Sequence, residues 1–243
     1  MVIEWKEKEH GEEDEMVMEN EAFMNALKNC GLKKFFLTPC LRAQPELPQY
    51  LVSIWDENEE VFKLRDQVLE LEVSDVYFIT GLSHRGPVPI LTGSRPSGEK
   101  MEQVMARVCP GARTGSGSGK VDIHTVQDLA LRAVLHTITR VAGSQAPHKA
   151  TKAQLLLAAD CMSPTLFDWA TALTTNIKRQ LTKCKQVKLK QFGYGSILVS
   201  FILERIPIFQ GQGAIVAEPI RREPRMARWV ALMPRSGGGQ QMS

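Results

Sequence analysis

The segment formed by residues 194–204 constrains the fold more than any other part of the sequence, because it is apolar on nearly every side of a helix. Its apolar run from 197 to 203 is interrupted by Ser200 and is far shorter than the roughly 20 residues needed to cross a bilayer. A helix that is apolar all round must be covered by other elements. The sequence therefore predicts a buried helix, terminated by Pro207, and no membrane span.

Apolar residues that recur at spacings of three and four predict the helices around this segment. Asn20 can cap the first of them, Gly31 ends it, and Thr125 with Asp128 resembles a capping pair for another. Ser163-Pro164 is typical of a helix start, because proline at the first helical position loses no hydrogen bond. We expect helices over residues 20–30, 45–55, 75–79, 101–108, 125–142, 163–184 and, after a capping box of Thr151 and Gln154, over 151–157.

A short β-hairpin is expected at residues 61–71, where apolar residues flank the polar break Arg65-Asp66-Gln67. The glycines and prolines at 81–89 predict an irregular connection after it. The fold class that follows is mainly α, a multi-helix globular domain with one short β-hairpin.

Composition predicts tails on both sides of this domain. Residues 1–21 hold nine acidic and two basic side chains. They are expected to be an acidic disordered tail, or one that folds back on a basic face and competes with an anionic partner. The helical domain is expected over 22–209, with a flexible glycine-serine loop at 111–119. An Arg-, Pro- and Gly-rich flexible tail without much regular structure is expected over 210–243.

The cysteines and histidines indicate an intracellular chain without a metal site. The five cysteines are widely spaced and odd in number, which is typical of free thiols in a reducing compartment. No CxxC pair or short histidine spacing suits zinc.

The motifs that suggest an enzyme are incomplete. The stretch Gly115–Lys120 resembles a phosphate loop, but Thr114 and Val121 stand where that loop needs glycine and a hydroxyl residue. Ser196 lacks the glycine pattern of a hydrolase nucleophile, and His136 is expected to be a core or boundary residue. We therefore expect no enzyme, no cofactor and no small-molecule substrate.

An enzyme whose residues assemble only in three dimensions stays open as an alternative. Its candidate residues are His84 and Arg85, which lie in an irregular segment of the kind that often carries function, and Glu204. A fragment that folds but has no function is a further alternative.

Six cations without an intervening acidic residue occupy residues 178–190. They are a solvated helix face followed by a loop, or a surface that contacts phosphates or an acidic protein without base readout. The six residues are Lys178, Arg179, Lys183, Lys185, Lys188 and Lys190.

Three segments, taken in order, resemble one family. The first carries W, F-x-L, D-V, G-L and G-x-P-V, at Trp55, Phe62, Leu64, Asp75, Gly81 and Gly86. The second carries W, R-x-L and C, at Trp169, Arg179, Leu181 and Cys184. The third covers residues 193–207 and closes on Glu204-Arg205-Ile206-Pro207. Together they are similar to the plant mobile domain, also called the aminotransferase-like plant mobile domain, over about residues 35–229. Glu72 departs from the family, which usually has threonine there.

The resemblance implies a nuclear protein of the Main-like, transposon-associated kind, linked to transposable elements or their silencing and to meristem maintenance. The expected partner, contacted through the basic run at 178–190, is nucleic acid or a chromatin-associated protein. The resemblance supplies no catalytic residue and no oligomeric state. Its structural residues are Trp55, Asp75, Gly81, Trp169, Glu204, Arg205 and Pro207.

Glu204 and Arg205 are expected to pair with charges on other elements and to fix how neighbouring helices dock. The reason is that an unpaired charge at the end of a buried helix costs several kcal/mol.

Overall fold

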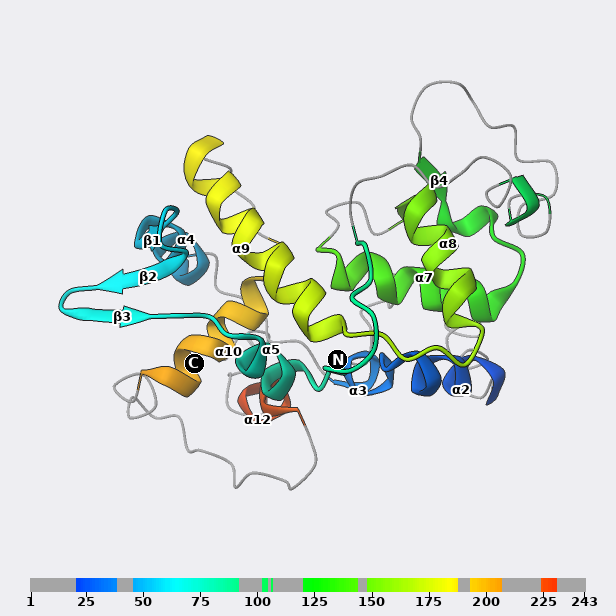
Figure 1. The fold of residues 1–243 in the computed structure, drawn as a ribbon, viewed down its shortest axis with the longest axis horizontal. Coiled ribbons are helices and arrows are strands. Elements are labelled where there is room, and N and C mark those ends of the chain that lie inside the picture. Colours follow the sequence, from blue (N-terminus) through cyan, green and yellow to red (C-terminus); the bar gives the residue numbers. More distant parts are fainter. Residues whose placement is uncertain are drawn as a thin grey trace, which may run out of the picture.

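The computed structural model describes residues 21–38, 46–91, 102–104, 106, 120–143, 148–187, 193–206 and 224–230. These residues form a mainly α fold, as predicted, with two small antiparallel sheets (Figure 1). Two groups of helices lie side by side in Figure 1, and one hydrophobic core runs through both. No helix in the described ranges is long and apolar enough to cross a membrane.

The first group, which we call the α7 group, combines the N-terminal helices with the middle of the chain. Its helices α2, α7 and α8 pack on one another, and α3 packs on α2. The predicted apolar stripe of α2 is buried, at Phe23, Ala26, Leu27 and Cys30. The group consists of α2 (Glu21–Cys30), α3 (Lys33–Leu37), β4 (Lys120–Asp122), the 3-10 turn η1 (Ile123–Thr125), α7 (Leu129–Val141), β5 (Lys149–Thr151) and α8 (Lys152–Cys161).

The second group, which we call the α10 group, is built around the apolar helix. It contains α4 (Glu46–Ser53), β1 (Trp55–Asp56), β2 (Val61–Leu64), β3 (Gln67–Leu69), α5 (Val73–Thr80), α9 (Trp169–Val187), α10 (Gly195–Arg205) and α12 (Arg225–Val230). Helix α10 packs against α4, α5 and α12, and its residues 197–203 are all buried. The prediction of a central buried helix is therefore confirmed.

The predicted hairpin is present as β2 and β3, with Phe62 opposite Leu69. The structure adds a third strand, because Trp55 of β1 pairs with Phe62. Both rings of this pair are fully buried and 4.9 Å apart between centroids.

The helix predicted to start at Ser163-Pro164 starts later, at Trp169. Backbone hydrogen bonds explain the difference: the N–H of Asp168 donates to Pro87 O at 3.0 Å, and that of Ala170 donates to Ser83 O at 3.0 Å. The segment before α9 is thus held non-helical against residues 83–87. A local start signal was overridden by a long-range contact.

Helix α7 also begins differently from the prediction. Asp128 is its N-cap and accepts from Leu131 N–H at 3.0 Å, whereas Thr125 ends the preceding 3-10 turn. The capping box of α8 is confirmed, since Thr151 N–H donates to Gln154 Oε1 at 2.8 Å and Gln154 N–H to Thr151 Oγ1 at 3.2 Å. The short elements α3, β4 and β5 were not predicted.

The C-terminal tail expected from residue 210 onward contains a helix, α12, which corrects that prediction for residues 225–230. Its Met226 is fully buried and joins the core. Some predictions concern residues outside the described ranges: the acidic segment 1–20, most of the helix predicted over 101–108, the loop 111–119 and Pro207.

Candidate functional site

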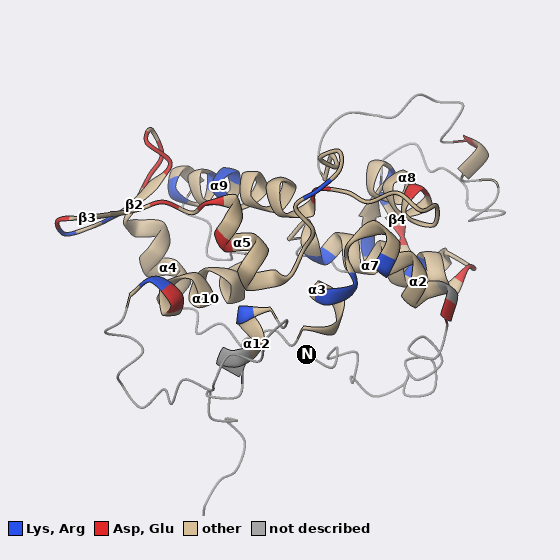
Figure 2. Cartoon of the chain, turned by 60° about the horizontal axis from the view of Figure 1, so that its bottom comes forward, with Lys and Arg blue, Asp and Glu red and all other residues tan. Residues whose placement is uncertain are grey.

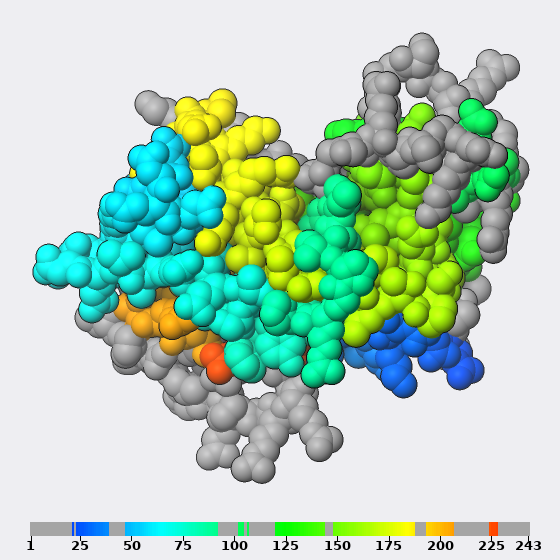
Figure 3. Space-filling view, viewed as in Figure 1, coloured from blue at the N-terminus to red at the C-terminus, as the bar shows by residue number. Residues whose placement is uncertain are grey.

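A pocket of about 510 Å³ lies where the ends of α2 and α5 meet α3 and the segment that follows α5. Residues 82–91 then run over the surface between α9 and the α7–α8 pair (Figure 3). The pocket is lined by Lys28, Gly31, Lys33, Lys34, Tyr77, Gly81, Ser83, His84 and Arg85.

Two glycines allow the helix ends to approach this closely. Gly31 has φ +85° and Gly81 has φ +68°, so both occupy the left-handed region that favours glycine after a helix. A side chain at Gly31 would collide with Ser83, and a Cβ at Gly81 would lie 2.6 Å from Pro224 Cγ. The structural role predicted for Gly81 thus has a physical basis in the packing of α5.

The lining of the pocket is strongly cationic. It includes Lys28, Lys33, Lys34 and Arg85, and no carboxylate is among the described residues that line it. Within the described chain these four side chains form no hydrogen bond or ion pair. Figure 2 shows α3 in blue at this place, whereas acidic red segments lie around β2 and β3. An anion that enters the pocket therefore displaces no partner that belongs to the described residues.

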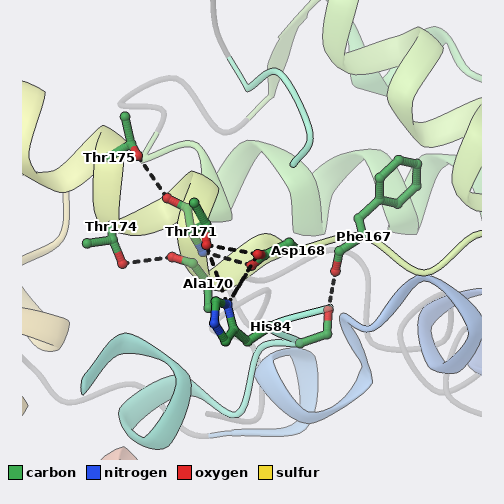
Figure 4. Close-up of polar contacts among 8 residues, drawn as sticks. His84, Phe167, Asp168, Ala170, Thr171, Thr174 and Thr175 are labelled. Carbon is green, nitrogen blue, oxygen red and sulfur yellow. Dashed lines mark hydrogen bonds and ion pairs between the residues drawn. The ribbon is translucent and has the colours of Figure 1, made fainter. Parts of the chain in front are cut away.

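His84 enters the pocket in a fixed orientation (Figure 4). Its Nδ1 lies 3.2 Å from Asp168 Oδ1, and Asp168 also accepts from Thr171 N–H at 3.0 Å and from Thr171 Oγ1 at 2.9 Å. Burial alone would raise the pKa of Asp168, but these hydrogen bonds and the nearby His84 hold it below its ordinary value. The ionised carboxylate fixes Nδ1, which leaves Nε2 for a ligand.

The hydroxyl groups nearest to His84 are already engaged. Ser83 Oγ donates to Phe167 O, and Thr171 Oγ1 donates to Asp168. Thr171 Oγ1 also lies 3.4 Å from His84 Nδ1, but its shorter contact, 2.9 Å, is to Asp168 Oδ2. Neither hydroxyl is therefore well placed as a nucleophile activated by His84. In the described part of the chain, no group of three or more His, Cys, Asp or Glu could hold a metal ion.

Two of the cations predicted as a basic face lie on α9, away from the pocket, and have internal partners. Lys178 Nζ is 3.6 Å from Glu60 Oε2 and 3.6 Å from Glu70 Oε1, and its side chain is 18% exposed. Lys185 Nζ donates to the carbonyl oxygen of Trp55. These two ammonium groups hold the β1–β3 sheet against α9.

The other two described cations of that run, Arg179 and Lys183, are both exposed, and Arg179 has an internal hydrogen bond. Arg179 Nη2 donates to Asn176 Oδ1 at 2.8 Å, and the amide of Asn176 donates to Ala142 O at 3.1 Å. Arg179 therefore supports the contact between α9 and the end of α7, while Lys183 is exposed. Lys188 and Lys190 lie outside the described residues. Arg179, Lys183 and Lys185 are exposed and Lys178 is partly buried, so the predicted basic face stays a prediction for the exposed cations.

The two tryptophans of the predicted structural set are fully buried and hydrogen-bonded. Trp55 Nε1 donates to Thr182 Oγ1 at 3.1 Å, and Trp169 Nε1 donates to Cys30 O. Trp169 thereby ties the start of α9 to the end of α2, next to the pocket.

The expectation that Glu204 and Arg205 have partners is confirmed. Arg205 Nη2 lies 2.6 Å from Asp75 Oδ1, and Glu204 Oε2 lies 3.2 Å from Arg225 Nη1. These pairs connect α10 with α5 and α12. Glu204 does not line the pocket, so the structure brings together His84 and Arg85 of the proposed enzyme residues but not Glu204.

His136 lies half-buried on α7, in agreement with the boundary role expected for it. Burial, followed by the charges of Arg140 and His124, lowers its pKa to about 4. His136 is therefore neutral near pH 7 and does not add to the positive charge of the fold.

The pocket lysines have only a weak signal in the sequence. Lys28, Lys33 and Lys34 flank the helix break at Gly31, and counting cations on both sides of that break would have identified them. Their proximity to Arg85 and Tyr77 depends on tertiary structure. No family model, no curated protein and no solved structure matches this chain.

Proposed function

We propose that this chain is a non-enzymatic interaction domain that binds an anionic partner at the pocket between α2, α3 and α5. The proposal is carried by four cations without a partner in the described chain, around a pocket that no described carboxylate lines: Lys28, Lys33, Lys34 and Arg85. Like charges held close together repel, so an anion that enters relieves an unfavourable interaction as well as forming new ones.

Helix dipoles offer a simpler reason for some of these cations. Lys28 lies in the last turn of α2 and Lys34 in the last turn of α3, where a positive charge is favourable. Lys33 begins α3 and Arg85 lies outside any helix, so the dipole does not explain them. A ligand accounts for all four together.

The resemblance to the plant mobile domain suggests where such a partner is found. It supports a nuclear, transposon-derived protein whose partner is nucleic acid or a chromatin-associated protein. The cation-lined pocket would supply the contacts to phosphates or carboxylates that this role needs.

The test is the affinity of the full chain for random-sequence duplex DNA as a function of salt. The variant Lys33→Gln/Lys34→Gln/Arg85→Gln should weaken binding at least tenfold and reduce the salt slope by about one for each phosphate that the protein no longer neutralises. A matched control removes the same charge elsewhere, at Lys120, Lys149 and Lys152, which have no partner in the described chain. An equal reduction of affinity in both variants, or no salt dependence, would refute the proposal.

The second candidate function is an enzyme with His84 as its acid or base. The favouring observation is the Asp168 carboxylate at 3.2 Å from Nδ1, since a buried carboxylate orients catalytic histidines in the same way. Phosphate monoester and diester substrates, tested with the wild-type chain and with His84→Ala, separate the two candidates. Turnover that disappears in His84→Ala would favour the enzyme.

A further inference from the structure

We propose that the pocket takes a nucleoside phosphate, with the phosphate on the cations and the base against the ring of Tyr77. This inference rests on the proposed function and names the chemistry of its ligand. The nucleoside phosphate is either part of a single strand of nucleic acid or a free nucleotide.

The first argument is the position of Tyr77. This residue lines the pocket from α5 together with the cations, and it is 40% exposed. Its ring is supported by Phe78, whose centroid lies 5.0 Å away at an interplanar angle of 70°. Phe78 is itself held by the guanidinium of Arg225, 4.8 Å from its centroid. Tyr77 is therefore a supported aromatic surface rather than a loose side chain.

The second argument is that no cation of the described chain lies over the Tyr77 ring. The cation–π contacts of the described residues involve Phe201 and Phe78, so no lysine of the pocket lies over Tyr77. An aromatic ring beside unpaired cations is the combination that binds single strands, where bases stack on the ring and cations contact the backbone.

The third argument is the size and the donors of the pocket. A volume of about 510 Å³ lies within the usual range for pockets that hold small ligands, and one nucleotide is of that size. Lys33, Lys34 and Arg85 supply charge-assisted donors for phosphate oxygens, and His84 adds an oriented ring nitrogen. A duplex can reach the cations at the rim, but its stacked bases are not available to Tyr77.

A phosphorylated peptide is the competing occupant. It would use the same cations but would gain nothing specific from an aromatic ring, so Tyr77 distinguishes the two. The distinguishing variants are Tyr77→Leu, which removes the ring, and Tyr77→Phe, which keeps it.

The experiment measures binding of the full chain to an oligothymidylate of about 12 nucleotides, to its duplex, to AMP and to a phosphoserine peptide. Tyr77→Leu should weaken binding of the single strand between about 5-fold and 150-fold, the range for removal of stacking on one ring. Tyr77→Phe should bind like wild type, and duplex binding should change by less than about twofold. Binding of AMP at comparable affinity would identify the free nucleotide as the source, and binding of the oligomer alone would identify the strand.

A second measurement uses only the wild-type chain, so its result does not depend on whether a variant folds. The wild-type chain should bind an abasic oligomer, which has the same phosphates and no bases, more weakly by the same factor. Equal affinity for the abasic and normal oligomers would overturn the inference, as would a Tyr77→Leu chain that folds and binds normally. If Lys33→Gln/Lys34→Gln/Arg85→Gln still weakens binding in that case, the proposed anion-binding function stands and only the nucleoside phosphate as ligand is refuted. Tighter binding of the phosphoserine peptide, unaffected by Tyr77→Leu, would replace the nucleotide with a phosphopeptide.

Discussion

The pocket and helix α9 both gather lysines and an arginine, but the described cations of α9 have more partners within the chain than those of the pocket. On α9, Lys178 lies 3.6 Å from each of two carboxylates and Lys185 is bonded to a backbone carbonyl. In the pocket, Lys33 and Arg85 have no partner within the described residues. Only part of the run that is dense in the sequence has partners in space, since Lys183 is exposed, whereas cations that are scattered in the sequence meet in the pocket.

The difference teaches that a run of like charges does not by itself show which of its cations are open to a ligand. A cation that is already paired must break that pair before it binds a ligand, so it adds little net affinity. A cation held near other cations contributes its full charge to an incoming anion.

The largest effect should come from reversing charge in the pocket. In Lys33→Glu/Arg85→Glu, repulsion replaces attraction at two positions, and we expect affinity for DNA to fall about 100-fold or more at low salt. Fluorescence anisotropy checks this, with Arg179→Glu/Lys183→Glu as the matched variant on α9. A greater reduction of affinity for the α9 variant would break the comparison.

The next effect concerns a cation with a structural partner. Arg205→Ala removes two donors from Asp75, whose side chain is only 12% exposed. We expect a decrease of about 1–2 kcal/mol in the free energy of unfolding, because the remaining carboxylate is left partly desolvated. Urea denaturation measures it. An unchanged midpoint would show that this pair does not fix the docking of α10.

The third effect concerns Asp168, whose carboxylate lies beside the pocket and faces His84. Asp168→Asn keeps a good helix cap for Thr171 N–H but loses the charge that faces His84, so we expect about 1 kcal/mol less stability at neutral pH and a slightly higher affinity for DNA.

The pH dependence of this variant follows from the pKa of Asp168, which is lower in the folded chain than its ordinary value. The stability that the carboxylate contributes is present above the unfolded pKa of about 4 and is lost as pH falls through the folded one. The difference between wild type and Asp168→Asn should therefore shrink below about pH 4. A difference that stays constant with pH would contradict the assigned role of the charge.

The smallest effect should be the difference in stability between a Lys178 variant and a Lys33 variant. Lys178→Gln removes an ammonium between Glu60 and Glu70 and should cost about 0.5 kcal/mol. Lys33→Gln should leave the thermal midpoint unchanged or raise it, because it relieves repulsion in the pocket. Equal destabilisation by both changes would mean that the pocket lysine also has a structural partner.

Local patterns predicted the parts of the fold that depend on neighbours in sequence. Gly31 ends α2 as expected, Gly81 opens the predicted irregular connection after α5, and the box at Thr151 starts α8. These signals work because a helix end is satisfied by groups within four residues of it. The predicted start of α9 was wrong because the backbone N–H of Asp168 donates a hydrogen bond to the carbonyl oxygen of Pro87, a contact that no local pattern can indicate.

The sequence by itself determined the helical class, the hairpin and the burial of α10, because hydrophobic periodicity and caps are local properties. Only the tertiary structure decided which cations are paired, where Tyr77 meets the lysines of α2 and α3, and how Asp168 orients His84. The physical reason is that electrostatic interaction depends on distance in space. Residues that are far apart in the sequence become neighbours only when the core has packed.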